Sequence, residues 1–159
     1  MRRKCGFTIV EMMVVLGIVA ILMLMALPSY QDKFIRDQIA EALPLAEIVK
    51  GPVAAAWTAG QPFPVDNAAA ALPPADKIVN NFISSVAVQD GAIHITFGNR
   101  ANAQIKGKRL TLRPAVVEDA PIVPVTWVCG NAPAPDKMTV KGENRTDLPA
   151  SYLPVRCRA

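Results

Sequence analysis

Apolar residues run almost without interruption from position 7 to position 28, and Glu11 is the only charged residue among them. A helix of these 22 residues would be about 33 Å long, enough to cross the hydrocarbon core of a bilayer. The pattern therefore predicts a transmembrane helix. A carboxylate in hydrocarbon costs roughly 2.5–3.5 kcal/mol on insertion scales, so a segment that served only as an anchor would have little reason to carry Glu11.

A second helical pattern follows Pro28, which we expect to interrupt the helix near the membrane surface because proline lacks a backbone donor. Over residues 29–57, apolar side chains recur at steps of three and four, the spacing of one helix face. We expect Pro44 and the pair Gly51-Pro52 to bend or break this helix. The apolar stripe consists of Ile35, Ile39, Leu43, Ala46, Val49, Val53 and Trp57.

An irregular connection and a set of strands follow the helix. Residues 58–78 are rich in Pro and Ala, which predicts a loop with a single short helical turn. Four stretches then have strand character: "FISSVAV", "AIHITF", "KRLTLRP" and "PVTWVC". The first two flank Asp90-Gly91, a strong hairpin signal. The prediction is an α+β fold, in which a long N-terminal helix packs on a four-stranded antiparallel sheet.

The alternation along the strands also predicts which side chains face the helix. Ile93, Ile95 and Phe97 point one way, so His94 and Thr96 point the other. We therefore expect His94 to be an exposed structural residue and not part of a site. The other inward residues are expected to be Leu110, Leu112, Val125, Trp127 and Cys129.

The net charge of +4 is concentrated at the N-terminus. Arg2, Arg3 and Lys4 are three of the seventeen basic residues, so fourteen remain against thirteen acidic ones. A basic cluster directly before an apolar helix should hold the N-terminus in the cytoplasm and send the rest of the chain outward. We expect an exported domain with little net charge.

The three cysteines divide between the two sides of the membrane. Cys5 falls on the cytoplasmic side, whereas Cys129 and Cys157 fall in the exported part, where an oxidising compartment favours a disulfide between them. The alternative is two buried free thiols. A bridge would tie down a tail with little apolar content, a contribution on the order of 3–4 kcal/mol in the chain-entropy model. No spacing resembles a metal site, and we expect neither a metal nor a cofactor.

Three ordinary interpretations of the N-terminus each leave something unexplained. A secretory signal would need a clean A-x-A cleavage site and a shorter apolar core. A plain membrane anchor leaves Glu11 unexplained. A lipoprotein signal requires a cysteine after the apolar run, whereas Cys5 precedes it.

The string "KCGFTIVE", residues 4–11, resembles the class III leader of type IV pilins. The resemblance implies that a prepilin peptidase cuts after Gly6, that Phe7 is then N-methylated, and that the apolar helix remains as membrane anchor and later as filament core. Glu11 of one subunit would meet the new Phe7 amine of a neighbour and set the register of assembly. Separating such a desolvated pair would strand one buried charge.

Two further stretches resemble type IVa pilins. "SYQDKFIRDQIAEAL" is similar to the second half of the pilin helix, and "TWVC … LPASYLPVRCR" to the disulfide-bounded C-terminal region. In that family the enclosed segment is exposed on the filament and often meets receptors or neighbouring subunits. The resemblance implies a leader at 1–6, a transmembrane and filament-core helix at 7–30, an amphipathic helix half at 31–57, a connecting loop at 58–81, and the sheet with its C-terminal region at 82–159.

Candidate chemistry is sparse. No Ser/His/Asp grouping, glycine-rich phosphate loop or carboxylate pair is present, so we do not expect an enzyme. Asn144-Arg145-Thr146 matches a glycosylation sequon, a pattern too short to carry a prediction. Between Asp90 and Glu118 the charged residues are all basic: Arg100, Lys106, Lys108, Arg109 and Arg113. They could bind DNA phosphates, although no aromatic residue lies among them to stack on bases. Alternatively, they pair with acidic groups of neighbouring subunits or prevent aggregation through the sheet edge.

The resemblance therefore predicts a structural subunit of a type IV pilus, a surface filament for adhesion, twitching motility or DNA uptake. The expected partners are identical or related pilin subunits, the prepilin peptidase/N-methyltransferase, an inner-membrane assembly platform, the membrane before assembly, and a host receptor or DNA. Three alternatives stay open: a minor DNA-binding pilin for competence, a type II secretion pseudopilin, and a monomeric membrane-anchored binding domain. The C-terminal cysteine pair and the ending "YLPVRC" count against the pseudopilin, and only a simple anchor should tolerate loss of Glu11.

Overall fold

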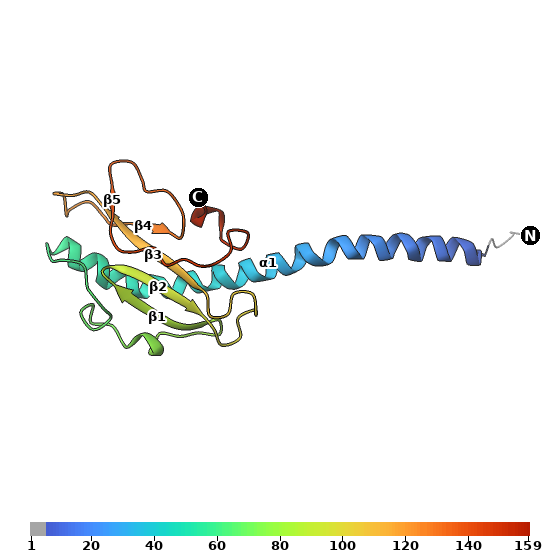
Figure 1. Cartoon of the computed structure of the whole chain (residues 1–159), viewed down its shortest axis with the longest axis horizontal. Helices are drawn as coiled ribbons and strands as arrows, with labels where there is room; N and C mark the ends of the chain where they lie inside the picture. Colours follow the sequence, from blue (N-terminus) through green and yellow to red (C-terminus); the bar gives the residue numbers. More distant parts are fainter. Residues whose placement is uncertain (1–5) are drawn as a thin grey trace, which may run out of the picture. The chain divides into compact units, whose positions relative to one another are not determined.

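The computed structural model describes residues 6–159, apart from the side chains of residues 27–29. The chain divides into two compact units, of which the first ends at Phe34 and the second spans Ile35–Ala159. One helix, α1 (Ile9–Thr58), runs through both (Figure 1). The second unit also contains η1 (Ala75–Lys77), β1 (Ile83–Gln89), β2 (Ala92–Phe97), β3 (Arg109–Val116), β4 (Thr126–Cys129), β5 (Thr139–Val140) and η2 (Val155–Cys157).

Helix α1 continues through the prolines at which we expected it to stop. The expected interruption at Pro28 is wrong, and the helix also runs unbroken through Pro44 and Pro52. A proline removes one helical donor and frees the carbonyl four residues earlier. For Pro44 and Pro52 those carbonyls belong to Ala40 and Ile48, both of which are exposed residues whose carbonyls water can reach. Packing of the opposite helix face on the sheet offsets the cost that remains.

The apolar stripe of α1 is buried in the second unit, as its spacing predicts. Five of its members are at most 1% exposed, and fully burying a side chain of this kind contributes about 1.5–3 kcal/mol. Trp57, the last member, is only partly buried and stacks on Phe63 with ring centroids 5.3 Å apart. The five are Ile35, Ile39, Ala46, Val49 and Val53, and Leu43 follows at 8% exposed.

The sheet confirms the predicted antiparallel order and adds one strand. The four long strands pair in the order β1-β2-β3-β4, and β5 pairs with the far end of β3 (Figure 1). The predicted hairpin joins β1 to β2, with Asp90 and Gly91 at φ 49° and 80°. These positive values are the reason the turn favours this residue pair. Strand β5 was not predicted, because two residues are too few to show alternation.

The free edge of β1 is covered by side-chain amides and not by another strand. Asn67, from the connection between α1 and β1, accepts a hydrogen bond from the Val88 backbone N–H at 2.6 Å and donates one to the Val86 carbonyl at 3.0 Å. Asn99 donates to the Ile83 carbonyl at 2.8 Å. These bonds take the place of those that another strand beside β1 would make, so the edge is closed to further pairing.

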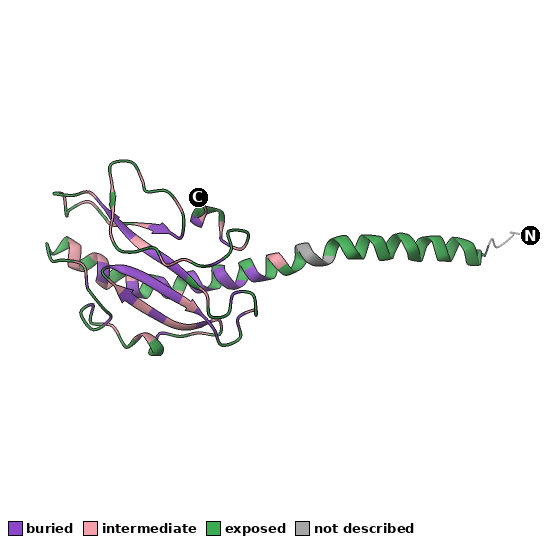
Figure 2. Cartoon of the chain, viewed as in Figure 1, coloured by how far each residue is buried: buried purple, intermediate pink, exposed green. Residues whose placement is uncertain are grey.

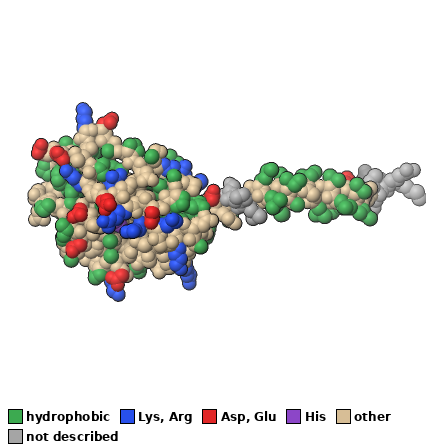
Figure 3. Space-filling model, viewed as in Figure 1, with side chains coloured by type: hydrophobic (Ala, Val, Ile, Leu, Met, Phe, Trp, Pro, Cys, Tyr) green, Lys and Arg blue, Asp and Glu red, His purple; other side chains and the backbone are tan. Residues whose placement is uncertain are grey.

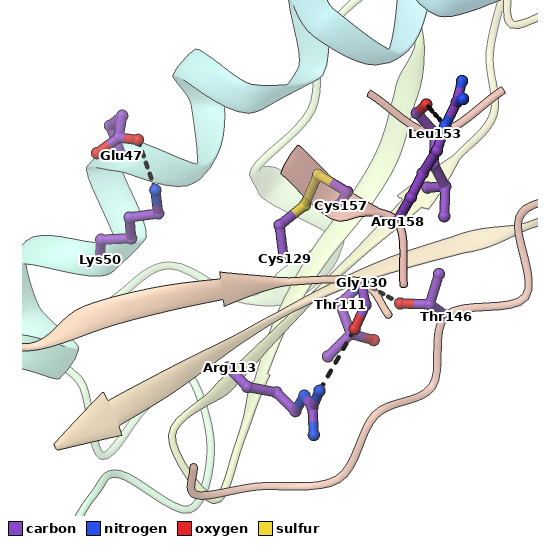
Figure 4. Close-up of a disulfide and its surroundings, with 10 residues drawn as sticks. All are labelled: Glu47, Lys50, Thr111, Arg113, Cys129, Gly130, Thr146, Leu153, Cys157 and Arg158. Atoms are coloured by element: carbon purple, nitrogen blue, oxygen red, sulfur yellow. Dashed lines mark hydrogen bonds and ion pairs between the residues drawn. A yellow bond between two sulfur atoms is a disulfide. The ribbon is translucent and has the colours of Figure 1, made fainter. Parts of the chain in front are cut away.

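The predicted disulfide joins Cys129, the last residue of β4, to Cys157 in η2 (Figure 4). The two Cα atoms lie 4.6 Å apart, and both cysteines are buried. The bridge therefore holds the C-terminal segment against the end of β4, and the buried Leu153 of that segment joins the hydrophobic core.

One expectation about the sheet is wrong: His94 is buried, with 5% of its surface exposed. Its strand alternates as predicted, but residues 143–147 of the C-terminal region cross the outer face of β2 and β3 and cover it. Figure 2 accordingly shows β2 and β3 buried over most of their length. We call residues 143–147 the strap.

Candidate functional site

The start of α1 explains why a hydroxyl residue stands at position 8. The Thr8 hydroxyl oxygen accepts a hydrogen bond from the Glu11 backbone N–H at 3.2 Å, and the Thr8 carbonyl accepts one from the Met12 N–H at 3.2 Å. Thr8 is thus the N-cap of the helix, and Glu11 stands in its first turn. A carboxylate at this position is favoured by the positive end of the helix dipole.

The helix of the first unit presents apolar side chains to its surroundings on every side. Large hydrophobic residues from Phe7 to Met25 are between 39% and 81% exposed, and Figures 2 and 3 show this segment as an exposed helix with hydrophobic side chains along it. By length and composition α1 is able to cross a membrane. A soluble monomer rarely exposes so large an apolar surface, so this helix needs a covering.

Gly6 has no structural reason to be glycine. A Cβ atom built at this position would meet no atom of the described residues within 4 Å, and the residue does not have a positive φ. Neither packing nor backbone conformation therefore requires glycine here. The basic residues Arg2, Arg3 and Lys4, and Cys5, lie outside the described residues.

The strap is held on the sheet mainly through Thr111 of β3. The Thr111 N–H donates to the Thr146 hydroxyl at 3.0 Å, and the Thr111 hydroxyl accepts from the Arg145 N–H at 3.1 Å (Figure 4 shows the Thr111–Thr146 bond). Below this hydroxyl lies His94, whose Nδ1 is 3.0 Å from it. Further along, the Asp147 N–H donates to the Arg109 carbonyl at 3.2 Å.

His94 lies in surroundings that disfavour its charged form. Burial lowers the pKa of its imidazole, and the guanidinium groups of Arg145 and Arg109 lower that pKa further, against a smaller opposing effect of Glu143. The Nε2 atom is buried and has no hydrogen-bond partner within the described part of the chain. At neutral pH the imidazole of His94 is therefore uncharged, and it lies buried between the sheet and the strap.

The five basic residues do not form one stripe. Arg113 of β3 is partly buried and donates to the Gly130 carbonyl at 3.4 Å, with its Nε enclosed (Figure 4). Arg109, at the start of β3, is exposed beside the strap. Arg100, Lys106 and Lys108 instead belong to the loop between β2 and β3. Residues adjacent in the sequence thus separate into two groups, because a strand and a loop orient their side chains differently.

Among the residues that the structure describes, no three His, Cys, Asp or Glu side chains are grouped so as to hold a metal ion. The features that stand out are surfaces: the exposed apolar helix of the first unit and the strap-covered sheet of the second.

Comparison with known proteins agrees with this arrangement. The model of the pilin family, described as a bacterial filament protein, matches residues 36–158, and the prokaryotic N-terminal methylation motif matches residues 1–27. The chain belongs to the pilin family. Relatives of this pilin include the type IV major pilin protein PilE1 of Neisseria gonorrhoeae, 35% identical over 96% of this chain and 86% of the relative. A fimbrial protein of Neisseria meningitidis serogroup A is 35% identical over 96% and 93%, and the fimbrial protein EcpC of Eikenella corrodens 33% over 96% and 90%.

The family and its methylation motif show where this pilin is located. The precursor is anchored in the membrane by the apolar helix, and the mature pilin is part of an extracellular pilus. The exposed apolar surface of the first unit has a covering at each stage, first lipid and then other pilin subunits.

Proposed function

We propose that this pilin is the repeating structural subunit of a type IV pilus, and that its N-terminal helix is both the membrane anchor and the core of the filament. The observation that carries the proposal is the exposure of the large apolar side chains from Phe7 to Met25 around one helix. Lateral packing of such helices in a filament would remove these side chains from water, as the bilayer does before assembly. The names of the relatives favour a pilus over a type II secretion filament.

Processing after Gly6 is the first finer step of the proposal. A glycine that nothing in the described fold requires is explained if a prepilin peptidase recognises it beside the bond that it cuts. The cut would leave Phe7 as the N-terminal residue, next to the N-cap Thr8. Methylation of the Phe7 amine by the same enzyme would follow.

Glu11 would then set the register between subunits. Its carboxylate lies in the first turn of α1 and is exposed, so a neighbouring helix can reach it. The partner is the Phe7 amine of the adjacent subunit. Two charges that are each costly in an apolar medium stabilise one another when paired, and removing one costs about 3–5 kcal/mol because the other stays buried.

The finished filament, and not the single chain, would act in adhesion, twitching motility or DNA uptake. An inner-membrane assembly platform would extract each processed subunit from the bilayer and add it to the filament base. A host receptor would meet the outer surface of the second unit, where the strap and the disulfide-bounded segment lie.

Mass spectrometry of sheared surface filaments tests the proposal. We expect the chain in quantity, beginning at N-methylated Phe7 and two hydrogens lighter than the reduced form. A mature chain that begins anywhere else would contradict the processing step and leave Glu11 without its partner. Absence of the chain from the filaments would contradict the proposed function itself.

Substitution at position 11 tests the register. Glu11→Ala and Glu11→Gln should both leave the precursor folded and inserted but strongly reduce the yield of filaments. Asp76→Asn is the matched control, because Asp76 is an exposed acid whose contact with Lys77, at 3.7 Å, lies on the surface of the second unit. Normal filament yield from Glu11→Ala would contradict the register role proposed for Glu11.

A further inference from the structure

The loops of the sheet lie at two opposite ends. In an antiparallel order β1-β2-β3-β4, the turn after β1 and the loop after β3 fall at one end, and the loop after β2 falls at the other (Figure 1). We call residues 98–108 the β2–β3 loop and residues 117–125 the β3–β4 loop. Their charges are opposite: the first carries three basic residues and no acidic one, the second two acidic residues and no basic one.

The β2–β3 loop is a fixed basic surface. Ala101 and Ile105 are buried in the core, and the Asn102 N–H donates to the Gln38 side chain on α1 at 2.9 Å. These anchors leave the basic side chains pointing away from the core. No ion pair is found for them within the described part of the chain. They are Arg100 and Lys106, which are exposed, and Lys108, which is partly exposed.

Two more basic residues lie at the same end of the second unit. The Nε atom of Arg36 and an Nη atom of Arg158 both donate to the Ser151 carbonyl, at 3.0 Å and 3.2 Å. Both guanidinium groups are thereby held in place without any carboxylate. The end with the β2–β3 loop therefore carries a group of basic side chains held in place. Its acidic neighbours are the exposed Asp37 on α1 and the exposed Asp147, whose carboxylate accepts the Arg109 N–H.

The β3–β4 loop has the complementary features. Ile122 is 89% exposed, the highest value among the large hydrophobic side chains described, and it stands between Pro121 and Pro124. Prolines on both sides restrict the backbone of this tip. Beside it Asp119 is exposed and Glu118 pairs with Lys141 at 2.7 Å. An apolar tip flanked by acid is suited to a partner that offers a basic rim.

We propose that the β3–β4 loop of one subunit docks against the β2–β3 loop of another copy farther along the filament. The proposal rests on the function given above, because subunits that pack through one helix all point the same way and present unlike ends to each other. Such a contact is heterologous and extends indefinitely, which a filament requires. Ile122 supplies apolar contact, and Asp119 faces Lys106 and its basic neighbours.

The ion pairs contribute little to the stability of a single contact, but the filament repeats the contact at every subunit. An exposed ion pair changes an association constant by roughly two- to fivefold. Every subunit within the filament makes the contact twice, once with each end. Reversing one charge should therefore lower the resistance of sheared filaments to heat and salt without preventing the chain from folding.

Engineered cysteines test the geometry directly. Filaments of Lys106→Cys with Ile122→Cys in the same chain should give a ladder of disulfide-linked oligomers under mild oxidation. Each single variant should give no ladder, and Lys77→Cys with Ile122→Cys is the matched control, because Lys77 is exposed on η1 at the side of β1. Normal filaments without a ladder would overturn the proposal. If the pair variant does not assemble, Arg100→Cys replaces Lys106→Cys.

Charge reversal gives an independent measurement. Asp119→Lys and Lys106→Glu should each destabilise sheared filaments, and the two together should recover part of the loss. Two single variants as stable as the wild type, or a double variant no better than the added losses, would overturn the proposal. So would a Lys106→Glu filament of normal stability that binds less duplex DNA, since the basic loop would then serve nucleic acid. Absence of wild-type filaments would instead contradict the proposed function.

Discussion

The imidazole of His94 lies under the hydroxyl of Thr111, with Nδ1 3.0 Å from the oxygen that also accepts the Arg145 N–H of the strap. One threonine side chain thus joins a buried histidine to the segment that covers it. Protonation of His94 would add a positive charge that burial disfavours and that the guanidinium groups of Arg145 and Arg109 repel, the causes that lower the pKa of its imidazole.

Acid should therefore loosen the strap. The pKa of His94 is lowered from its ordinary value of 6.5 in the folded chain, so the unfolded chain binds a proton first as the pH falls. Stability is then complete above about pH 6.5 and decreases as the pH falls through the lowered pKa. We expect faster amide exchange at residues 143–147 of filaments at pH 5 than at pH 7, after correction for intrinsic rates.

His94→Gln is the control for this pH effect. Glutamine can keep a hydrogen bond to Thr111 but does not titrate, so the acid-dependent part of the exchange should disappear while the exchange at neutral pH changes little. Identical pH profiles for His94→Gln and the wild type would assign the loosening to the carboxylates of Glu143 and Asp147 instead.

The disulfide should stabilise the second unit by confining its unfolded state. Replacing both Cys129 and Cys157 by serine is expected to lower the free energy of unfolding by about 3–4 kcal/mol, the chain-entropy estimate for a loop of 28 residues. Urea unfolding of detergent-solubilised precursor, followed by Trp127 and Trp57 fluorescence, measures it. A loss below about 1 kcal/mol would mean that the core residue Leu153 already holds the segment in place.

Asn67 should protect the β1 edge. Asn67→Ala removes the bonds to Val86 and Val88 and leaves buried backbone groups unpaired, at a cost of about 1–3 kcal/mol. The exposed edge should also make the purified variant aggregate faster, as light scattering would record. Asn81→Ala is the control, because Asn81 is exposed and its side chain makes no hydrogen bond in the described structure. Equal aggregation of both variants would exclude the edge as the cause.

Gly6→Val should separate processing from folding. A Cβ at position 6 meets no other atom within 4 Å, so the stability of the second unit should not change. If the prepilin peptidase recognises Gly6, the Gly6→Val variant should accumulate as uncut precursor in the membrane. Immunoblots for precursor and mature chain, with Gly51→Ala as a control at another glycine without neighbours, make the comparison. Normal cutting of Gly6→Val would remove the role proposed for this residue.

Much of the fold could be predicted because each of its parts repeats a local pattern. The helix stripe from Ile35 to Val53 and the alternation around Ile93 and Ile95 are direct consequences of helix and strand geometry, and both are buried as expected. Asp90-Gly91 specifies its own turn. The N-terminal assembly features lie in consecutive residues, so their resemblance to pilins is visible without any structure.

The failures came from contacts between distant segments. The alternation along β2 predicts an exposed His94, but the strap that covers it has no periodicity and begins almost fifty residues later. The division of the basic cluster arose in the same way, since Arg113 is covered by the region around Gly130. The prolines of α1 predict breaks, but the cost of a freed carbonyl depends on whether water reaches it, which the sequence does not show.

The disulfide has a practical consequence. Residues 132–138 lie mostly at the surface between Cys129 and β5, and the disulfide ties the chain just before them to Cys157. A foreign peptide could replace them while the hydrogen bonds of the strap and the core stay intact. The filament would then display that peptide at regular intervals along its whole length, as a vaccine carrier or a scaffold for immobilised enzymes needs.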